Sequence, residues 1–418
     1  MKIAELYKHY SINYLVATDT RKIRENSLFF ALKGDHFNGN EFAEKALAMG
    51  AKYAIIDEEI YQKNSNYILV ANVLKTLQEL ANYHRKKLAI PIIGITGSNG
   101  KTTTKELINA VVSKKFKTVA TKGNLNNHIG VPLTLLSFDS TTEIGIVEMG
   151  ANHQKEIEFL CGICAPDFGY ITNFGKAHLE GFGGINGVIK GKSELYDYLK
   201  NKTKTVFVNT EDALQIEKTN GIKRELISKN IAFIETNPFV KLTYKNTPIQ
   251  SNLIGSYNYN NIAIAITIGE FFTISDAKIK EAIVNYFPNN NRSQLIKKNS
   301  NTIILDAYNA NPSSMKVALE SFAKLNEKNK TVILGDMFEL GKSAKKEHQF
   351  IVDFATSLNF DTYYFVGEHF YKTITEHQKF RTFEDLKNAL IQDKINTNFI
   401  LIKGSRGMAL ERAIDFII

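Results

Sequence analysis

Residues 94–104 read Gly-Ile-Thr-Gly-Ser-Asn-Gly-Lys-Thr-Thr-Thr, and this stretch decides the fold class. An apolar run, Leu88 to Ile95, leads into it, and a helix-like stretch, Glu106 to Val112, follows it. A loop that wraps a polyphosphate needs small residues, a lysine for the β and γ oxygens, and a hydroxyl for Mg²⁺ at a helix N-terminus. Glycines, Lys101 and Thr102 occupy those places. A nucleotide-binding strand, loop and helix are therefore predicted, and a Gly-rich turn with a solvated lysine is the alternative.

The glycine spacing of this loop departs from the common pattern. The chain has G-x-x-G-x-x-G-K-T, whereas the common G-x-x-x-x-G-K-T would place its first glycine at Ile95. Gly94 and Gly97 stand on either side of that position. The spacing points to a particular branch of phosphate-loop proteins.

Length and composition indicate an ordinary globular protein of several domains. At 418 residues the chain exceeds the size at which one core keeps growing, so two or three domains are expected. The N-terminus has no uninterrupted apolar core of a signal peptide. The longest apolar region, Ile262 to Ile274, is interrupted by Gly269 and Glu270 and is too short to span a bilayer. We therefore expect no transmembrane segment and a cytoplasmic location.

The formal net charge of +9 has two explanations. A basic surface can bind nucleic acid, because it releases counterions from the phosphate backbone. The lysines are scattered in pairs, however, as at Lys86-Lys87 and Lys345-Lys346, with no Arg-rich arm. A small anionic substrate accounts for the sign equally well, so no nucleic-acid partner is expected.

Cys161 and Cys164 are the only cysteines and form a C-x-x-C. In a thioredoxin-like setting such a pair is redox-active, and in a doubled array it binds zinc. Here the pair ends an apparent helix, Glu156 to Ile163, and its spacing puts both thiols on one face. Buried structural thiols are the favoured interpretation.

The chain divides into three segments, all of which we predict to be α/β. Residues 1–85 form a small α/β unit, with a turn rich in Gly, Asp and Asn from Gly34 to Asn40. In residues 86–288 and 289–418, apolar runs alternate with helical patterns, which argues for parallel sheets covered by helices. The last boundary falls near 286–291, where Pro288 precedes three asparagines. The expected strands are 27–32 and 53–56 in the first segment, 90–96, 144–148, 168–173 and 205–209 in the second, and 302–306, 331–335, 363–367 and 399–403 in the third.

Polar residues at strand ends are the candidates for chemistry, since open α/β sheets bind ligands there. Glu148 closes an apolar strand and would emerge near the phosphate loop as a Mg²⁺ ligand. His178 follows another strand and could bind a second metal ion. A surface glutamate and an ordinary loop histidine are the alternatives. Lys192 lies in a charged helical stretch, and its spacing alone indicates a solvated lysine.

A series of motifs runs in order over essentially the whole chain. The motifs are Gly94-x-x-Gly97-x-x-Gly100-Lys-Thr-Thr, Gly123-Asn-Leu-Asn-Asn127, Glu148-Met-Gly, His178, Lys192, Gly255-Ser-Tyr-Asn258-Tyr-Asn-Asn261, Arg292-Ser-Gln294, Asp306 to Met315, Leu334 to Gly341 and Lys403-Gly-Ser-Arg-Gly407. Together they resemble the Mur ligases, the amide-forming enzymes of peptidoglycan precursor synthesis, to which folylpolyglutamate synthases are related. The resemblance implies three domains: a small α/β UDP-binding domain, a central ATPase-type parallel sheet with the phosphate loop, and a C-terminal Rossmann-like domain.

Two of these blocks resemble the family member that adds D-alanyl-D-alanine. They are the Tyr-Asn-Ala-Asn-Pro block from Tyr308 and the Leu-Gly-Asp-Met-Phe-Glu-Leu-Gly block from Leu334. The member that adds the third amino acid would show a Tyr-Ala-His-x-Pro block and an Asp-Asn-Pro-Arg sequence, which the chain lacks. One position departs from the family pattern, because Tyr257 stands where a histidine is usual.

The resemblance implies a role for each site residue. Lys101, Lys192, His178 and Asn127 would be catalytic. Asn258 and Asn261 would contact adenine, and Arg292 and Asp306 would engage ATP phosphate and ribose from the last domain. Thr102, Glu148, His178 and Lys192 would hold Mg²⁺, with Lys192 N-carboxylated so that it acts like an aspartate. The phosphates would lie on Gly97, Ser98, Asn99, Gly100, Lys101, Thr102 and Thr103.

The implied reaction joins D-Ala-D-Ala to UDP-N-acetylmuramoyl-tripeptide through an acyl phosphate, with ATP as the phosphoryl donor. The first domain would bind the UDP end with its Gly34 to Asn40 turn, and the protein is expected to be a monomer. A folylpolyglutamate or cyanophycin-type ligase would share the central domain, but the N-terminal UDP-type segment and the Tyr308 to Met315 block argue against it. A non-catalytic nucleotide-binding module would need only the phosphate loop.

Overall fold

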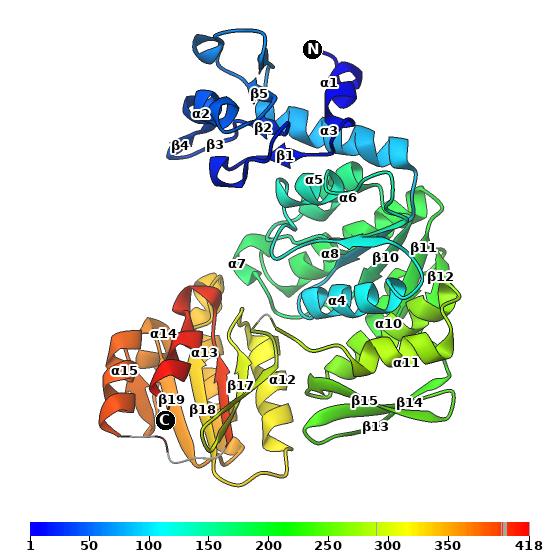
Figure 1. The fold of residues 1–418 in the computed structure, drawn as a ribbon. Coiled ribbons are helices and arrows are strands. Elements are labelled where there is room, and N and C mark those ends of the chain that lie inside the picture. Colours follow the sequence, from blue (N-terminus) through cyan, green and yellow to red (C-terminus); the bar gives the residue numbers. More distant parts are fainter. Residues whose placement is uncertain (290, 394, 396–398, 418) are drawn as a thin grey trace.

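The computed structural model describes residues 1–289, 291–393, 395 and 399–417. Three α/β parts follow one another along the chain: an N-terminal part, a central part and a C-terminal part (Figure 1). The predicted α/β class with parallel sheets is confirmed. The domain limits at residues 85 and 288 stay a proposal. The first falls inside α3 (Val73–Leu88), and the second lies between α11 (Asp276–Val284) and β16 (Gln294–Lys298), where Asn290 of the predicted boundary is outside the described residues.

The N-terminal part is a parallel sheet of order β1-β2-β5-β6 with a small hairpin, β3-β4, at the predicted turn. Its helix α3 begins at the Asn72 cap, whose side chain accepts a hydrogen bond from the Lys75 N–H, and ends in a basic last turn. The other bounds are α1 (Ile3–Tyr10), β1 (Val16–Ala17), η1 (Thr20–Lys22), β2 (Leu28–Phe30), β3 (Lys33–Gly34), β4 (Phe37–Asn38), η2 (Gly39–Phe42), α2 (Ala43–Ala48), β5 (Tyr53–Ile56), η3 (Glu59–Tyr61) and β6 (Tyr67–Leu69).

Helix α3 joins the N-terminal part to the central part. One face of it shares a continuous apolar core with both, so the core is not divided between them. Polar groups at this junction also form a hydrogen bond and an ion pair. The ring of His84 contacts the Phe138 carbonyl at 3.0 Å, and Arg85 pairs with Asp167 at 2.6 Å. A shared core predicts that these two parts unfold together.

The central part is a six-stranded parallel sheet of order β12-β11-β10-β7-β9-β8. All five residues of β7 (Ile92–Thr96) are buried, as expected of a strand covered by helices on both faces. Its other elements are α4 (Lys101–Val112), β8 (Thr118–Ala120), α5 (Gly130–Leu135), β9 (Ile144–Glu148), α6 (Glu156–Cys164), β10 (Phe168–Ile171), α7 (Leu179–Phe182), α8 (Ile185–Asn201), β11 (Thr205–Val208), α9 (Ala213–Lys218), β12 (Lys223–Leu226), α10 (Asn258–Phe271) and α11.

Cys161 and Cys164 lie in the last turns of α6 and are both buried. Burial raises the pKa of both thiols. A protonated thiol away from solvent is a poor nucleophile and a poor metal ligand. The prediction of buried structural thiols is confirmed.

An antiparallel sheet of three strands follows β12, and the sequence analysis missed it. Its strands are β13 (Ile231–Thr236), β14 (Phe239–Tyr244) and β15 (Thr247–Ile254). The signal was available in β14, where every second residue is buried against α10 and α11. That period of two is typical of a strand with one covered face.

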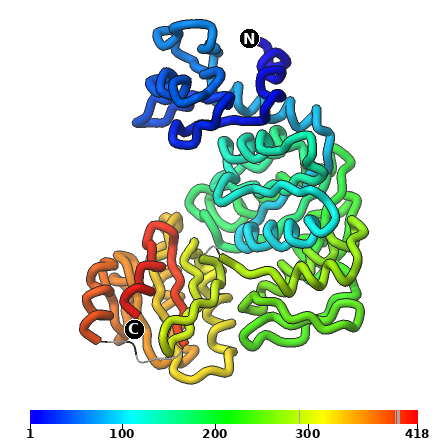
Figure 2. Tube along the Cα trace, viewed as in Figure 1, coloured from blue at the N-terminus to red at the C-terminus, as the bar shows by residue number. Residues whose placement is uncertain are grey.

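The C-terminal part is a sheet of order β16-β17-β21-β18-β19-β20, in which only β16 runs antiparallel to its neighbour. Figure 2 shows the red end of the chain beside the yellow segment, because β21 pairs with both β17 and β18. The bounds are β17 (Asn301–Asp306), α12 (Pro312–Ala323), β18 (Lys330–Gly335), η4 (Gly341–Ser343), α13 (Ala344–Ser357), β19 (Thr362–Val366), α14 (Glu368–Tyr371), β20 (Gln378–Phe380), α15 (Phe383–Gln392), β21 (Phe399–Lys403), η5 (Arg406–Met408) and η6 (Leu410–Phe416).

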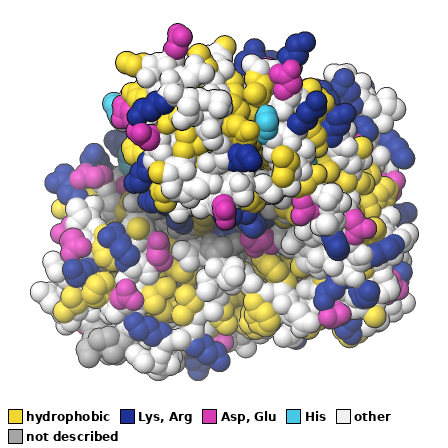
Figure 3. All heavy atoms as spheres, turned by 45° about the horizontal axis from the view of Figure 1, so that its top comes forward, with side chains coloured by type: hydrophobic (Ala, Val, Ile, Leu, Met, Phe, Trp, Pro, Cys, Tyr) yellow, Lys and Arg dark blue, Asp and Glu magenta, His cyan; other side chains and the backbone are white. Residues whose placement is uncertain are grey.

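The surface carries charges of both signs side by side. On the face in Figure 3, basic and acidic side chains are interspersed rather than gathered in one basic patch. Among the described residues, no helix has the length and apolar character needed to cross a membrane.

Candidate functional site

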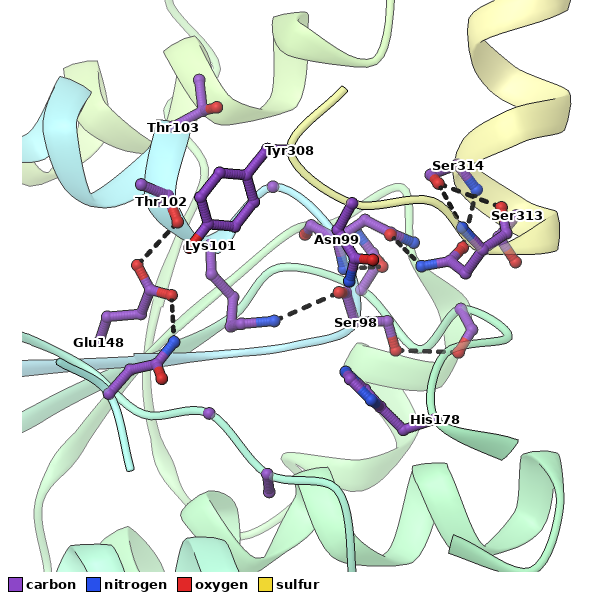
Figure 4. Close-up of a pocket in the computed structure, with 18 of the residues that line it drawn as sticks. Ser98, Asn99, Lys101, Thr102, Thr103, Glu148, His178, Tyr308, Ser313 and Ser314 are labelled. Atoms are coloured by element: carbon purple, nitrogen blue, oxygen red, sulfur yellow. Dashed lines mark hydrogen bonds between the residues drawn. The ribbon is translucent and has the colours of Figure 1, made fainter. Parts of the chain in front are cut away.

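A cleft of about 870 Å³ lies between the central and C-terminal parts. The phosphate loop and the ends of β9 and β10 form one wall, and residues around β17 and the start of α12 form the other (Figure 4). The sequence-predicted residues that line it are Ser98, Asn99, Gly100, Lys101, Thr102, Thr103, Asn127, Glu148, His178, Asn258, Asn261, Arg292 and Asp306. Gly97 and Lys192 lie just behind this lining, where each contacts it through one hydrogen bond.

The phosphate loop connects β7 to α4 through two glycines with left-handed backbones. Gly97 has a φ of 136° and lies so close to β10 that a Cβ would stand 2.0 Å from the Thr172 hydroxyl. Gly100, with a φ of 80°, begins α4. Only glycine fits the Gly97 position, since any side chain would push the loop away from β10.

The end of β10 holds the loop in place. The Ser98 hydroxyl donates to the Gly175 carbonyl at 2.9 Å, and the Asn99 N–H donates to the side-chain oxygen of Asn173 at 3.2 Å. The Thr172 hydroxyl donates to the Asn99 carbonyl at 2.6 Å. The sequence analysis did not identify Asn173, although its position just after a strand was a usable signal.

Lys101 is folded back over the loop. Its Nζ donates to the Gly97 carbonyl at 2.7 Å. It also donates to the Ser98 carbonyl at 3.2 Å, the bond drawn in Figure 4. Burial lowers the pKa of Lys101 to about 8, with Glu148 opposing the effect and Arg292 adding to it. A phosphate placed on the loop would replace the carbonyl oxygens as the partner of this amine and favour its charged form.

Thr102, Glu148 and Asn126 form a hydrogen-bonded group at the start of α4. The Thr102 hydroxyl donates to one carboxylate oxygen of Glu148 at 3.0 Å, and the Asn126 amide donates to the other at 2.8 Å. Glu148 is only 2% exposed, so the alternative of a surface glutamate is wrong. Sequence reasoning gave Asn126 no role. The predicted Asn127 lines the same cleft, and its side chain accepts from the N–H groups of Ile129 and Gly130 at the start of α5, so its catalytic role stays a prediction.

His178 faces the C-terminal part. It adopts a left-handed backbone before α7, and its Nδ1 pairs with the carboxylate of Glu339. Among the residues that the structure describes, no three His, Cys, Asp or Glu side chains gather in a group that could hold a metal ion by themselves. The role of His178 as a second metal ligand therefore stays a prediction, and Glu339 is a partner that the sequence analysis did not name.

Lys192 is 1% exposed, so the solvated lysine expected from spacing alone is wrong. It lies on α8, and its Nζ donates to the Ala151 carbonyl at 3.0 Å and stands 5.0 Å from the centre of the Phe182 ring. Burial holds the pKa of Lys192 well below its usual range, and Lys101 adds to this effect. Lys192 falls on the same face of α8 as the buried Val188 and Leu195, so the helical period was a usable signal that the sequence analysis did not apply.

Asn258 and Asn261 open α10 behind the phosphate loop. The Asn261 amide donates to the Asn258 side-chain oxygen at 2.8 Å and accepts from the Thr104 hydroxyl at 3.0 Å. These bonds tie α10 to α4, while both asparagines still line the cleft. Their contact with adenine stays a prediction. The neighbouring Tyr257, at the unusual position, bonds the Ser293 hydroxyl at 2.5 Å and so connects the central and C-terminal parts.

The opposite wall carries cations. The Arg292 guanidinium lies 3.8 Å from the centre of the Tyr308 ring, and its Nε is buried without a hydrogen-bond partner. Asp306 accepts from Lys403 at 2.5 Å and from the Ser293 N–H at 3.2 Å. Lys403 and Tyr308 were quoted in motifs but given no role. Arg292 lines the cleft, so its guanidinium is placed to bind an anionic ligand there.

Three family models match successive parts of the chain. They are the Mur ligase family catalytic domain at residues 14–91, the Mur ligase middle domain at residues 95–269, and the Mur ligase glutamate ligase domain at residues 291–406. Together they cover most of the chain.

Curated relatives match almost from end to end. The UDP-N-acetylmuramoyl-tripeptide--D-alanyl-D-alanine ligase of Bacillus subtilis is 33% identical over 96% of this chain and 93% of its own length. The protein of the same name from Borreliella burgdorferi is 31% identical over 95% and 92%. A crystal structure of MurF from Acinetobacter baumannii superposes with a TM-score of 0.85 at 29% identity, covering 96% of this chain and 92% of that one.

Proposed function

The chain belongs to the Mur ligase family, and we propose that it joins D-alanyl-D-alanine to UDP-N-acetylmuramoyl-tripeptide with conversion of ATP to ADP and phosphate. Relatives that carry this activity in their names match over nearly their whole length, which supports the substrate pair as well as the ATPase core. The two sequence blocks that separate this activity from its neighbour in the family also support it.

One observation carries the proposal: the cleft has a phosphate-binding wall and a cationic wall facing each other. The phosphate loop presents backbone N–H groups and Lys101, and Arg292 and Lys403 come from the other side of the cleft. Phosphoryl transfer depends on positioning and on stabilising the charge of the transferred group. Cations from two separate parts can meet one polyphosphate only when those parts are together, as they are here.

The residues at the start of α4 fit a magnesium ion. Mg²⁺ takes one or two protein oxygens and completes its shell with phosphate oxygens and water. Thr102 and Glu148 supply a hydroxyl and a buried carboxylate that already lie 3.0 Å apart. When bound there, the ion would neutralise phosphate charge and polarise the γ-phosphoryl group.

The chemistry has two steps. The terminal carboxylate of the tripeptide attacks the γ-phosphorus of ATP, the bond to the bridging oxygen breaks, and an acyl phosphate and ADP form. The free amine of D-Ala-D-Ala then attacks the acyl carbonyl, the bond to phosphate breaks, and the amine loses a proton as the amide forms. Lys101 and Arg292 hold the phosphate charge during the first step, and the closed cleft keeps water from the acyl phosphate.

Lys192 is proposed to carry an N-carboxylate. A neutral amine attacks CO₂ and loses a proton as the carbamate forms, whereas a protonated amine cannot attack, and burial favours the neutral form of Lys192 by lowering its pKa. The resulting carbamate would place a negative charge beside Lys101 and the metal site, where a charged ammonium would be repelled. The sequence resemblance implies this modification, and the buried amine supports it.

We test the activity by following ADP release from the purified protein with ATP, Mg²⁺ and UDP-N-acetylmuramoyl-tripeptide, with and without D-Ala-D-Ala. Release that needs both substrates, with a product of the pentapeptide mass, is expected. Turnover with glutamate and a folate instead would support the folylpolyglutamate alternative. Nucleotide binding without turnover under any of these conditions would support a binding module.

The proposed function also has consequences for the cellular location, the oligomeric state and the partners of the protein. A cytoplasmic location is proposed because ATP and UDP-linked precursors are found there. A monomer without a nucleic-acid partner is proposed because the cleft is built from one chain and the charges on the surface are mixed. Sedimentation velocity at micromolar concentration would reveal a dimer.

A further inference from the structure

We propose that Lys176 is a positioning residue that holds the C-terminal part against the phosphate loop, so that Arg292 and Asp306 face the nucleotide. The inference rests on the proposed function, since it concerns assembly of that same cleft. Lys176 lies in the segment between β10 and α7, two residues before His178. It was not among the residues that the motifs singled out.

Lys176 contacts two helices of the C-terminal part. Its Nζ pairs with the Glu347 carboxylate on α13 at 2.8 Å, and its backbone N–H donates to the Ser313 hydroxyl on α12 at 2.8 Å. The Glu347 side chain is only 9% exposed, whereas that of Lys176 is 49% exposed. Burying a carboxylate without a nearby cation costs desolvation free energy. The Lys176–Glu347 pair therefore favours the arrangement in which the central and C-terminal parts are in contact.

The same segment is attached to the phosphate loop. The carbonyl of Gly175, directly before Lys176, accepts from the Ser98 hydroxyl at 2.9 Å. A Cβ on Gly175 would lie 2.8 Å from the Asn99 side chain and 3.3 Å from Ser313, so this residue is packed between the loop and α12. A shift of the loop is therefore passed to Lys176 through direct contact.

Two neighbouring contacts also hold the C-terminal part against the central part. The Asn311 side chain, which caps α12, donates to the Asn99 side chain at 2.7 Å, and His178 pairs with Glu339. These contacts beside the cleft are polar, and the apolar contact between the two parts is confined to Ile254, Phe239 and Leu179, whereas the N-terminal part shares an extended apolar core with the central part. Polar contacts exchange readily with water, which suits a contact that must open to admit substrates.

Charge reversal and charge swap test the role of the pair. Lys176→Glu and Glu347→Lys should each lower kcat/KM for ATP by about fivefold to a hundredfold, mainly through KM, because closure then opposes like charges. The double variant should recover to within about threefold of the wild type. Lys346→Glu, which makes the same charge change at an exposed position on α13, should have no effect.

Small-angle scattering with ATP and Mg²⁺ gives a second measurement that does not depend on the acceptor substrate. The single variants should remain more extended than the wild type, and the double variant should compact again. The proposal fails if either single variant keeps kcat/KM within twofold, or if the swap does not recover it. Absence of ligation by the wild type would overturn the proposed function instead, and the scattering comparison would still decide the role of Lys176.

Discussion

Asn126 shows what a single side chain does in this cleft. Thr102 bonds one carboxylate oxygen of Glu148, and the Asn126 amide bonds the other. Asn126 thereby completes the hydrogen-bonded group that fits Mg²⁺. Side chains that orient a ligand of a metal commonly change metal affinity or activity by about ten- to a hundredfold when removed. The residue therefore belongs to the site although it has no place in the phosphate-loop motif.

Asn126→Ala should raise the Mg²⁺ concentration needed for half-maximal ADP release by about tenfold or more, because Glu148 loses one of its two fixed partners. Mg²⁺ titration of the initial rate measures this. Asn124→Ala is the matched control, since Asn124 also lines the cleft but only its backbone carbonyl contacts Asn126. Equal effects of the two substitutions would assign Asn126 a general structural role.

Lys192→Ala should reduce kcat by about a hundredfold or more, because the carbamate is lost from beside the metal site. Wild-type activity should fall in CO₂-depleted buffer and return when bicarbonate is added, while the variant should respond to neither. Added formate or acetate should restore part of the variant's activity. Full activity of Lys192→Ala without added carboxylate would disprove the modification.

At the scale of an element, the helices around the central sheet differ in how tightly they pack. Gly162 in α6 has no atom within 4 Å of the position a Cβ would take, whereas Gly191 in α8 would place a Cβ 2.5 Å from the Phe182 ring. The α8 helix packs closely on the Phe182 ring at Gly191, the residue before Lys192. Its glycine is therefore a packing requirement, and the glycine of α6 is not.

Gly162→Ala should stabilise the protein by about 0.5–1 kcal/mol, because alanine loses less backbone entropy in a helix than glycine does. Gly191→Ala should destabilise it, since the new methyl group must displace the Phe182 ring. Urea unfolding of both variants followed by circular dichroism measures the two effects. Changes of the same sign would contradict the packing described for these helices.

At the scale of the whole molecule, the two junctions between parts are built differently. The N-terminal and central parts share an apolar core across α3, with Tyr7 packed against it and bonded to the buried His84. The junction between the central and C-terminal parts combines ion pairs and amide contacts at the cleft with a smaller apolar contact, in which Ile254, Phe239 and Leu179 pack on the C-terminal core. We expect the first junction to stay closed during turnover and the second to open.

Acid should weaken the first junction. Burial lowers the pKa of His84 to about 4, so the folded state keeps a neutral ring that contacts Tyr7 and the Phe138 carbonyl. In the unfolded chain, His84 takes up a proton below about pH 6.5. The contribution of His84 to the free energy of unfolding is therefore complete above that pH and is lost as the pH falls towards 4. The loss between pH 7 and pH 4 should be about 3 kcal/mol.

Thermal and urea unfolding across this pH range measures the effect. His84→Gln keeps a neutral donor at the position and should flatten the pH dependence, although it lowers stability at pH 7. His36→Gln, at an exposed position of the same part, should leave the profile unchanged. An unchanged profile in His84→Gln would assign the acid sensitivity to other groups.

The order of motifs along the chain by itself determined the α/β class, the phosphate loop and the family. These follow from local chemistry: a loop that wraps phosphate needs glycines, a lysine and a hydroxyl at set spacings, and parallel strands need continuous apolar runs. The antiparallel strands β13 to β15 were missed because a short alternating segment such as β14 was outweighed by the parallel pattern around it.

Only the tertiary structure decided which side chains are buried and which partners they meet. Spacing indicated a solvated Lys192, but packing of α8 against Phe182 and the loop after β9 buries it and lowers its pKa. The sequence analysis also gave no role to Asn126, which the fold brings to Glu148, while the catalytic role of Asn127 stays a prediction. Contacts such as that of Lys176 with Glu347 join residues 171 positions apart, and no local pattern records such a separation. Burial and long-range pairing are properties of the assembled core, which is why they appear only when the chain is folded.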